Sequence, residues 1–169
     1  ILVDAALKVL PKHPKATVII CGEIQLEDQN YKNKMLRKIT DANLEKRILF
    51  LGKKPFEDLP KLFQGMSVVA ALSRNEGYGL TPLEGMASGA AVLTSSEGVW
   101  DELVRDGIDG YVVKTNDVFQ TSERLNTLIE NSSKTKIMGE NAAKYISENF
   151  SVEKEAEQII QHIRYVQNI

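Results

Sequence analysis

Cysteine and histidine are both scarce in this sequence of 169 residues, and their scarcity excludes two kinds of site. The lone cysteine, Cys21, rules out an intrachain disulfide framework and fits a reducing compartment. It lies in the apolar run ATVIIC with no histidine near it in the sequence, so we predict a buried, unreactive thiol. The two histidines, His13 and His162, are far apart, so we predict no metal site and no metal cofactor.

The sequence also lacks long hydrophobic runs and a surplus of charge. No apolar run approaches the roughly 20 residues of a membrane-spanning helix, and no signal peptide is recognisable. The formal net charge is −2, whereas nucleic-acid-binding proteins usually carry a basic surplus. Hydrophobic residues make up 43% and charged residues 26%, which is typical of one soluble globular domain with its own core. Because Ile1 lies inside a predicted helix, we expect the sequence to be a fragment of a longer protein.

The common phosphate-binding signatures are missing as well. The absence of GxxxxGK[ST] argues against a P-loop nucleotidase, and the absence of GxGxxG after the first apolar run argues against a dinucleotide-binding dehydrogenase. There is no Asp-x-Asp pair to hold a divalent cation on a diphosphate. Any bound diphosphate would therefore have to be neutralised by main-chain dipoles and basic side chains.

What the sequence does contain is an alternation of short apolar runs with amphipathic segments. The runs predict strands over 16–21, 47–52, 67–72, 90–94 and 110–113. Helices are predicted over 1–10, 27–43, 57–65, 80–88, 99–106, 116–131, 134–149 and 152–166, with Asn116 and Ser151 as N-caps of two of the last three. This order indicates the α/β class, with a Rossmann-like parallel sheet, helices on both faces and a final run of helices. Ligands bind such sheets beyond the carboxyl ends of the strands, so we expect Gly22, Gly52 and the loops 73–80 and 95–99 to line one edge.

One of these loops leads into SRNEGYGLTPLEGMASG, residues 73–89, which holds two glutamates on either side of a glycine-rich turn. Thr81 is predicted as the N-cap of the following helix and Glu84 as its third residue, which is the spacing of a capping box. Backbone N–H groups at 79–81 would then face outward at the positive end of the helix, an arrangement that binds phosphate. Glu84 has two open roles, cap or ligand contact, whereas capping does not explain Glu76, for which we predict a ligand contact.

The segment NEGYGLTPLEGMASGAAVLTS, residues 75–95, resembles the E-x7-E signature of retaining glycosyltransferase family 4. These enzymes have the GT-B fold, in which two Rossmann-like domains face each other across a cleft. The flanking segments, 1–24, 46–72 and 99–113, are similar in the same order to the carboxyl-terminal domain of that family, most of all to its bacterial lipopolysaccharide-core mannosyltransferase branch. The resemblance implies that residues 1–169 form the nucleotide-sugar (donor) binding domain and that the amino-terminal acceptor domain is not in this chain.

The resemblance also implies roles for individual residues. Glu76, at the catalytic position, would contact hydroxyls of the donor sugar, and Glu84 would accept hydrogen bonds from the ribose. The segment that would hold the sugar and diphosphate consists of Gly77, Tyr78, Gly79, Leu80 and Thr81. The residues that would border the nucleotide are Gly22, Glu23, Gly52 and Lys53. No cofactor is implied beyond the donor substrate, a GDP-sugar or a UDP-sugar.

Some features depart from the family pattern. Ala71-Leu72-Ser73 stands where the family often has Pro-Ser, and Gly85 replaces a common alanine, which costs the helix up to about 1 kcal/mol. The Arg and Lys that bind phosphate in the family precede its first helix and so lie upstream of Ile1. We do not expect Arg74 and Lys53 to replace that lost positive charge.

The resulting hypothesis is a hexosyltransferase that acts with retention of configuration, in which this fragment binds the donor and is inactive alone. Its expected partners are the nucleoside diphosphate sugar, the amino-terminal domain and a glycan or lipid-linked acceptor, with no nucleic acid. We expect a cytoplasmic protein, or one held peripherally at the inner face of the membrane through its other half. The alternatives are a GT-B sugar-nucleotide epimerase or phosphorylase, and a non-catalytic nucleotide-sugar binding module.

Overall fold

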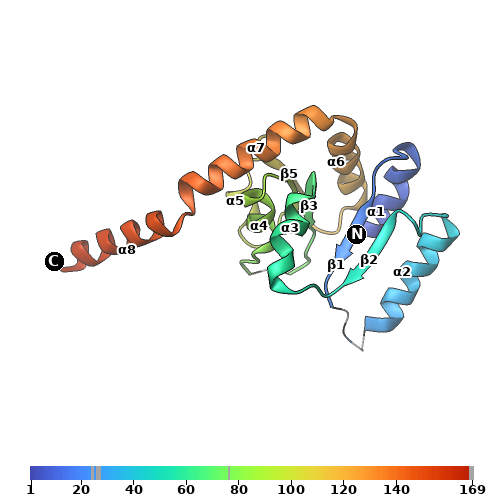
Figure 1. Ribbon diagram of the computed structural model, residues 1–169, viewed down its shortest axis with the longest axis horizontal. Helices are drawn as coiled ribbons and strands as arrows, with labels where there is room; N and C mark the ends of the chain where they lie inside the picture. Colours follow the sequence, from blue (N-terminus) through green and yellow to red (C-terminus); the bar gives the residue numbers. More distant parts are fainter. Residues whose placement is uncertain (24, 26–27, 76, 168–169) are drawn as a thin grey trace.

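The computed structural model describes residues 1–23, 25, 28–75 and 77–167 (Figure 1). All five expected strands are present, as β1 (Val18–Cys21), β2 (Ile48–Gly52), β3 (Val68–Ala71), β4 (Ala91–Ser95) and β5 (Gly110–Val113). The helices are α1 (Leu2–Val9), α2 (Gln29–Asp41), α3 (Leu59–Gln64), α4 (Thr81–Ala87), α5 (Trp100–Leu103), α6 (Val118–Glu130), α7 (Ser132–Asn149) and α8 (Val152–Gln167), and short 3₁₀ helices are η1 (Leu10–Lys12) and η3 (Phe56–Asp58). Strands and helices alternate up to β5, as the sequence pattern predicted.

The strands are all parallel, but they divide between two sheets. One sheet is the pair β1-β2, and the other has the order β3-β4-β5. The α/β class and its Rossmann-like arrangement are therefore confirmed. The division adds a feature that the sequence pattern did not show, because apolar runs identify strands and not their neighbours.

Helix α1 holds the two sheets together. Val3, Ala6 and Leu10 lie in the core that α2 and β2 share, whereas Ala5 and Val9 lie in the core of the three-stranded sheet. Residues three to four apart share one face of a helix, so two adjacent faces of α1 are apolar and both are buried. A single short helix thus packs against two separate cores.

Helices cover both faces of the three-stranded sheet. Neighbouring residues of β4 point to opposite faces, and Leu93 packs with α1 and α6 while Val92 packs with Met86 of α4 and Trp100 of α5. Met86 and Trp100 are fully buried, so both side chains belong to the core. Helices α4 and α5, which follow the loops at the ligand edge of this sheet, are therefore anchored in the core by these side chains.

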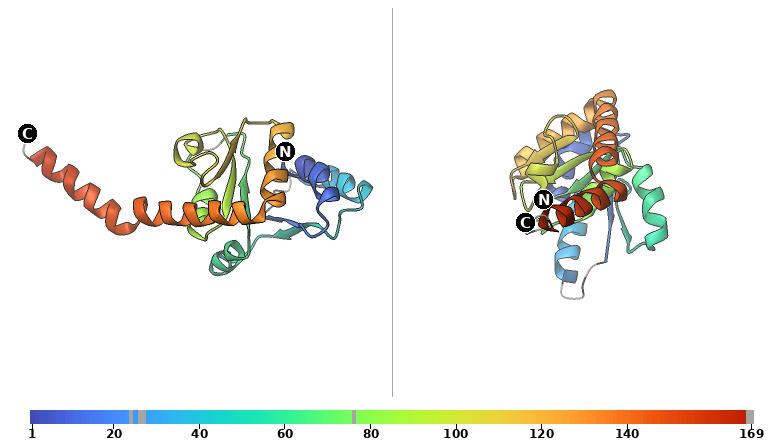
Figure 2. Two further views of the ribbon diagram at one scale, coloured as in Figure 1. Left: turned by 90° about the horizontal axis from the view of Figure 1, so that it is seen from above. Right: turned by 90° about the vertical axis from the view of Figure 1, so that its left-hand side faces the viewer.

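The carboxyl-terminal helices differ from expectation at one cap. Asp117, not Asn116, caps α6, since its Oδ1 accepts a hydrogen bond from the Gln120 N–H at 2.8 Å, while Asn116 takes a positive φ of 64°. The two adjacent residues carry the same kind of capping signal, so the pattern alone could not separate them. Ser151 does cap α8, because its hydroxyl accepts a hydrogen bond from the Lys154 N–H at 3.3 Å. Helix α8 extends away from the rest of the domain, and Figure 2 shows that it packs against neither sheet.

Candidate functional site

The carboxyl ends of β1 and β2 form the first part of the expected ligand edge. Gly22, directly after β1, and Gly52, the last residue of β2, both adopt positive φ values, 145° and 67°. The Gly22 N–H donates a hydrogen bond to the Gly52 carbonyl at 3.1 Å. A Cβ atom at either position would meet nothing within 4 Å, so these glycines are required by the backbone conformation and leave open space in front of the main chain.

Two of the residues expected to border a nucleotide meet at this same edge. The Lys53 ammonium lies 3.3 Å from the Glu23 carboxylate, and their side chains are 76% and 62% exposed. An ion pair this exposed contributes little stability, so both side chains can exchange partners when a charged ligand arrives. The pair joins the loop after β1 to the loop after β2.

Cys21 corrects one prediction from the sequence, because its thiol is exposed rather than buried. It is the last residue of β1, and its sulfur donates a hydrogen bond to the Gly52 carbonyl at 3.3 Å. It lies at the end of the strand, beyond the half-buried residues Val18, Ile19 and Ile20. An apolar run indicates a strand, but the final residue of the run already belongs to the ligand edge.

The glycine-rich loop forms the second part of the edge, beyond β3. Glu76 lies outside the described residues, so its contact with a sugar stays a prediction. Gly77 and Tyr78 are exposed, and Gly79 has a positive φ of 46°. The Ser95 hydroxyl at the end of β4 donates a hydrogen bond of 2.7 Å to the Ser73 carbonyl, which fixes the start of the loop to the neighbouring strand.

Tyr78 of the glycine-rich loop packs against Trp100. Its ring is tilted by 45° against that of Trp100, with the centroids 6.5 Å apart, a geometry within the range of favourable aromatic pairs. Trp100 is 1% exposed and anchored in the core, whereas Tyr78 is half exposed. The buried Trp100 ring thus supports the loop at Tyr78, and Tyr78 itself stays half exposed.

Glu84 is the site residue whose position in its helix differs from the prediction. Helix α4 begins at Thr81 with Leu80 as its N-cap and no side-chain cap, and the Glu84 N–H donates to the Leu80 carbonyl at 2.9 Å. The predicted capping box is therefore wrong: Thr81 is already helical and Glu84 is the fourth residue of the helix, one position too far for a box. The proline tolerates this shift, because its fixed φ also suits the second helical position.

The Glu84 carboxylate is consequently not used by the fold. It is half-buried, and it makes neither a hydrogen bond nor an ion pair with any residue that the structure describes. A half-buried carboxylate without a partner keeps its full capacity to accept hydrogen bonds from a ligand. Of the two roles left open by the sequence, the structure contradicts capping, and the ligand contact stays a prediction.

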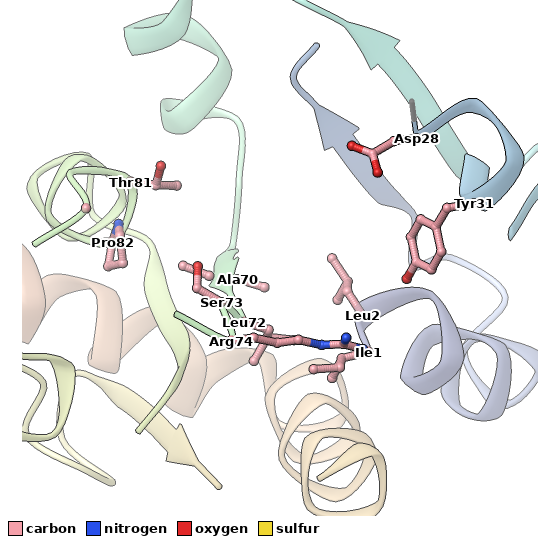
Figure 3. A pocket seen from close by; sticks show the side chains of 12 residues that line it. Ile1, Leu2, Asp28, Tyr31, Ala70, Leu72, Ser73, Arg74, Thr81 and Pro82 are labelled. Atoms are coloured by element: carbon pink, nitrogen blue, oxygen red, sulfur yellow. The ribbon is translucent and has the colours of Figure 1, made fainter. Parts of the chain in front are cut away.

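A cavity of about 660 Å³ lies between the two parts of the edge (Figure 3). It is lined by Ile1, Leu2, Asp28, Tyr31, residues 70–74, Gly79, Thr81 and Pro82. Arg74 extends into it toward Ile1 and Leu2. Asp28 and Tyr31 were not singled out in the sequence, since they lie at the start of an ordinary polar helix and only the fold brings them opposite the glycine-rich loop.

The predicted site residues thus fall into two groups on two sheets. Gly22, Glu23, Gly52 and Lys53 lie at the ends of β1 and β2, and residues 77–81 with Glu84 lie beyond β3 and on α4. Within the described ranges, no three His, Cys, Asp or Glu side chains gather closely enough to hold a metal ion. In the same part of the chain, no helix has the length and apolar character needed to span a membrane.

Several curated proteins that are similar to this chain are glycosyltransferases. The chain is 35% identical over 159 residues to the lipopolysaccharide core biosynthesis mannosyltransferase LpcC of Rhizobium leguminosarum bv. viciae, covering 94% of this chain and 45% of LpcC. It is 28% identical to the D-inositol 3-phosphate glycosyltransferase of Corynebacterium kroppenstedtii, covering 87% of this chain and 33% of that protein. The chain therefore spans less than half the length of these curated relatives.

Solved structures resemble this one closely. The carboxyl-terminal domain of LpcC from Francisella tularensis superimposes with a TM-score of 0.85 at 29% identity, over 89% of this chain and 78% of that one. HepE of Anabaena in complex with UDP gives a TM-score of 0.86 at 29% identity, over 97% of this chain and 44% of HepE. The fold is thus that of a carboxyl-terminal GT-B domain. The family model for glycosyl transferases group 1 matches residues 1–145, and the chain accordingly belongs to this glycosyltransferase family.

Proposed function

We propose that residues 1–169 form the donor-binding domain of a retaining family 4 glycosyltransferase, which moves a hexose from a nucleoside diphosphate sugar to a glycan or lipid-linked acceptor. The observation that carries this proposal is the state of Glu84, a half-buried carboxylate at the ligand edge of a parallel sheet that has no partner among the residues the structure describes. A similar domain in HepE has been solved with UDP and with UDP-glucose, which supports a nucleotide-sugar ligand at this fold.

Each part of the edge has a proposed role. Glu84 accepts hydrogen bonds from the two ribose hydroxyls, a task that suits a carboxylate because it is acceptor-only. The main chain at 77–80, together with Thr81, lies against the sugar and the diphosphate, and Glu76 contacts sugar hydroxyls. Gly22 and Gly52 let the nucleotide approach the strand ends closely, and the Glu23–Lys53 pair opens to make room for it.

The reaction we propose is a displacement on one face of the sugar. The acceptor oxygen bonds to the anomeric carbon from the side on which the bond to the diphosphate breaks, and a departing phosphate oxygen takes the acceptor proton. This step requires no protein base and no covalent intermediate. The contribution of the protein is to hold the donor in one geometry and to stabilise the charge that grows on the diphosphate.

The donor sugar and the acceptor follow from the relatives only by analogy. LpcC of Rhizobium leguminosarum and LpsB of Rhizobium meliloti are both lipopolysaccharide core mannosyltransferases. We therefore propose mannose as the hexose and a lipopolysaccharide core as the acceptor. Since HepE has been solved with UDP, both GDP-mannose and UDP-hexoses belong in the test. The match to a family of transferases favours transfer over the epimerase and phosphorylase alternatives.

The experiment is calorimetric titration of the natural-length protein with GDP, UDP, GDP-mannose and UDP-glucose, repeated for Glu84→Gln. We expect one nucleotide to bind and Glu84→Gln to weaken it about 10-fold, the effect of losing a hydrogen bond to a charged group. The melting temperature should stay within about 2 °C, because no partner of Glu84 is lost. Glu45→Gln is the matched control, since this exposed glutamate precedes β2 at the opposite end of the strand. Unchanged affinity in Glu84→Gln would contradict the proposal.

A further inference from the structure

The charged residues of this chain are unevenly distributed between its two parts. Residues 1–54, which supply α1, α2 and the β1-β2 pair, contain 11 Lys and Arg against 6 Asp and Glu. Residues 55–169 contain 10 Lys and Arg against 17 Asp and Glu. The formal net charge of −2 is therefore the sum of a basic part and an acidic part, and Figure 1 shows the basic part together on one side of the domain. An asymmetry of this kind indicates a surface that meets an anionic partner.

The acidic residues of the basic part lie mostly apart from its cations. Three of the six follow β1 in the sequence, within residues 23–28. A fourth, Asp4 of α1, is paired with Lys38 of α2. The two that remain, Asp41 and Glu45, lie ahead of β2. The excess of cations is therefore largest where the two strands begin.

Hydrogen bonds bring the segments that carry these cations together. The Arg47 guanidinium donates to the Leu10 carbonyl at 2.9 Å and to the Ala16 carbonyl at 2.7 Å, so the segment before β1 lies against the segment before β2. The Lys38–Asp4 pair joins α2 to α1. Six exposed cations lie on these two segments and two helices, and we call them the basic end: Lys8, Lys12, Lys15, Lys34, Arg37 and Lys46.

The stability of the fold accounts for only part of the basic end. The dipole at the carboxyl end of a helix favours a cation there, which applies to Lys8 of α1 and Lys12 of η1. The other four cations lie outside the last turn of any helix. None of the six forms an ion pair with a residue that the structure describes. Their charges are therefore free to meet a partner.

Three exposed carboxylates border the basic end. Asp41 and Glu45 lie on its own segments, and Glu130 of α6 accepts a hydrogen bond from Asn126, whose side chain also contacts His13. The six cations outnumber these carboxylates two to one. The surface thus keeps a positive net charge.

We propose that the basic end binds anionic lipid head groups at a membrane surface. Clusters of about four to eight Lys and Arg are typical of surfaces that bind acidic lipids, and the basic end has six. The choice of lipid rests on the proposed function, because a lipid-linked acceptor lies at a membrane. Surfaces that bind single-stranded nucleic acid combine cations with stacking aromatic rings, and segments 8–15 and 34–46 contain no Phe, Tyr or Trp. This domain then takes part in a membrane contact that the sequence assigned to the other half of the protein.

The basic end lies opposite the ligand edge. Gly22 and Gly52 are at the carboxyl ends of β1 and β2, whereas the basic end surrounds the start of both strands. These strands have four and five residues, which separates the two ends by about 15 Å of strand. A membrane at the basic end therefore leaves the donor edge uncovered, and an acceptor has to extend at least that far from the bilayer, as a glycan chain does.

The test is flotation of the natural-length protein with lipid vesicles, in the absence of nucleotide and acceptor, so its outcome does not depend on donor binding. We expect binding to vesicles of phosphatidylglycerol and phosphatidylcholine in equal parts at about 0.1 M salt, and no binding to phosphatidylcholine alone. At about 1 M salt the binding should disappear, because exposed charges are then screened within about 3 Å.

Substitutions test the surface itself. The triple variant Lys12→Gln, Lys15→Gln, Lys46→Gln should bind anionic vesicles about 100-fold more weakly, since each cation near an anionic bilayer contributes about 5-fold. The matched control changes three exposed lysines of α7 in the acidic part, Lys134→Gln, Lys136→Gln and Lys144→Gln. We expect the control to bind as the wild type does, and both variants to melt within about 2 °C of it.

Three results would overturn the proposal. Equal binding by the two triple variants would place the membrane contact elsewhere in the protein. Equal binding to the two kinds of vesicle would contradict a role for charge, because only one of them is anionic. Binding of a single-stranded RNA without binding of vesicles would assign the basic end to nucleic acid instead.

Discussion

The substitution Gly85→Ala has two opposite effects on stability, a gain in helix propensity and a steric clash with Val69, and their sizes can be compared. A glycine inside a helix is less favourable than alanine by about 1 kcal/mol, so helix propensity alone predicts that the variant gains stability. In the structure, however, an added Cβ would lie 2.7 Å from Val69 Cβ and 2.8 and 3.0 Å from its two methyl carbons. Val69 is buried on β3 and stiff at χ1, so it has little freedom to move away.

Overpacking a core by one methyl group costs about 1–3 kcal/mol, and three contacts at or below 3.0 Å place this site in the upper half of that range. After subtracting the gain in helix propensity, we expect a net loss of about 1–2 kcal/mol. For a protein of this size that corresponds to a fall of about 2–8 °C in the melting temperature.

The assay is thermal unfolding followed by circular dichroism, with Gly65→Ala as the matched control. Gly65 ends α3 with a negative φ, and its nearest atoms to an added Cβ are carbonyl oxygens at 3.5 and 3.7 Å, so we expect a change within about 2 °C. In a Val69→Ala background, Gly85→Ala should be less harmful by about 1 kcal/mol, because both methyl contacts are gone. A Gly85→Ala variant as stable as the wild type would refute the reasoning.

Two further predictions concern buried and paired polar groups. Thr94→Val should raise the melting temperature by about 2 °C, because the fully buried Thr94 hydroxyl has no partner among the described residues. Thr121→Val should lower the melting temperature, because the buried Thr121 hydroxyl donates a hydrogen bond to the Asp117 carbonyl at 2.7 Å. A loss of stability in Thr94→Val would show that the Thr94 hydroxyl does have a partner. The hydrogen bond from Lys38 on α2 lowers the pKa of Asp4 on α1 below its usual 3.8, so the ionised carboxylate stabilises the fold at neutral pH. That contribution is complete above the unfolded-state pKa and disappears as the pH falls through the lower folded-state value. The free energies of urea unfolding of the wild type and Asp4→Asn should therefore differ at pH 7 and converge as the pH falls through the lowered folded-state pKa of Asp4. A difference independent of pH would count against the role of the carboxylate.

Local signals in the sequence were sufficient for the elements themselves. Short β-branched runs predicted all five strands, because a strand buried on both faces must be apolar along its length. Glycines after β1 and at the end of β2 were expected at the ligand edge and are there with positive φ. The family resemblance rested on one glycine-rich segment and its order among flanking segments, and the match to glycosyl transferases group 1 confirms that the chain is a glycosyltransferase domain.

Local signals failed where two adjacent residues carried the same signal or where a run ended. Asn116 and Asp117 are equally good caps, and only the backbone path selects Asp117. The helix after the motif starts one residue early, which frees Glu84 from the capping box. Cys21 belongs to an apolar run but lies at its exposed end.

What the sequence by itself determined about this protein is therefore the identity and order of its strands and helices, since propensity and hydrophobic period act over a few residues. Only the tertiary structure decided which strands are neighbours, why position 85 must be glycine, and that Glu84 keeps a free carboxylate. The first two depend on contacts between residues distant in the chain, because β1 and β3 leave edges unpaired and Val69 excludes a Cβ from α4. Such contacts depend on packing in three dimensions, and no local pattern of residues encodes them.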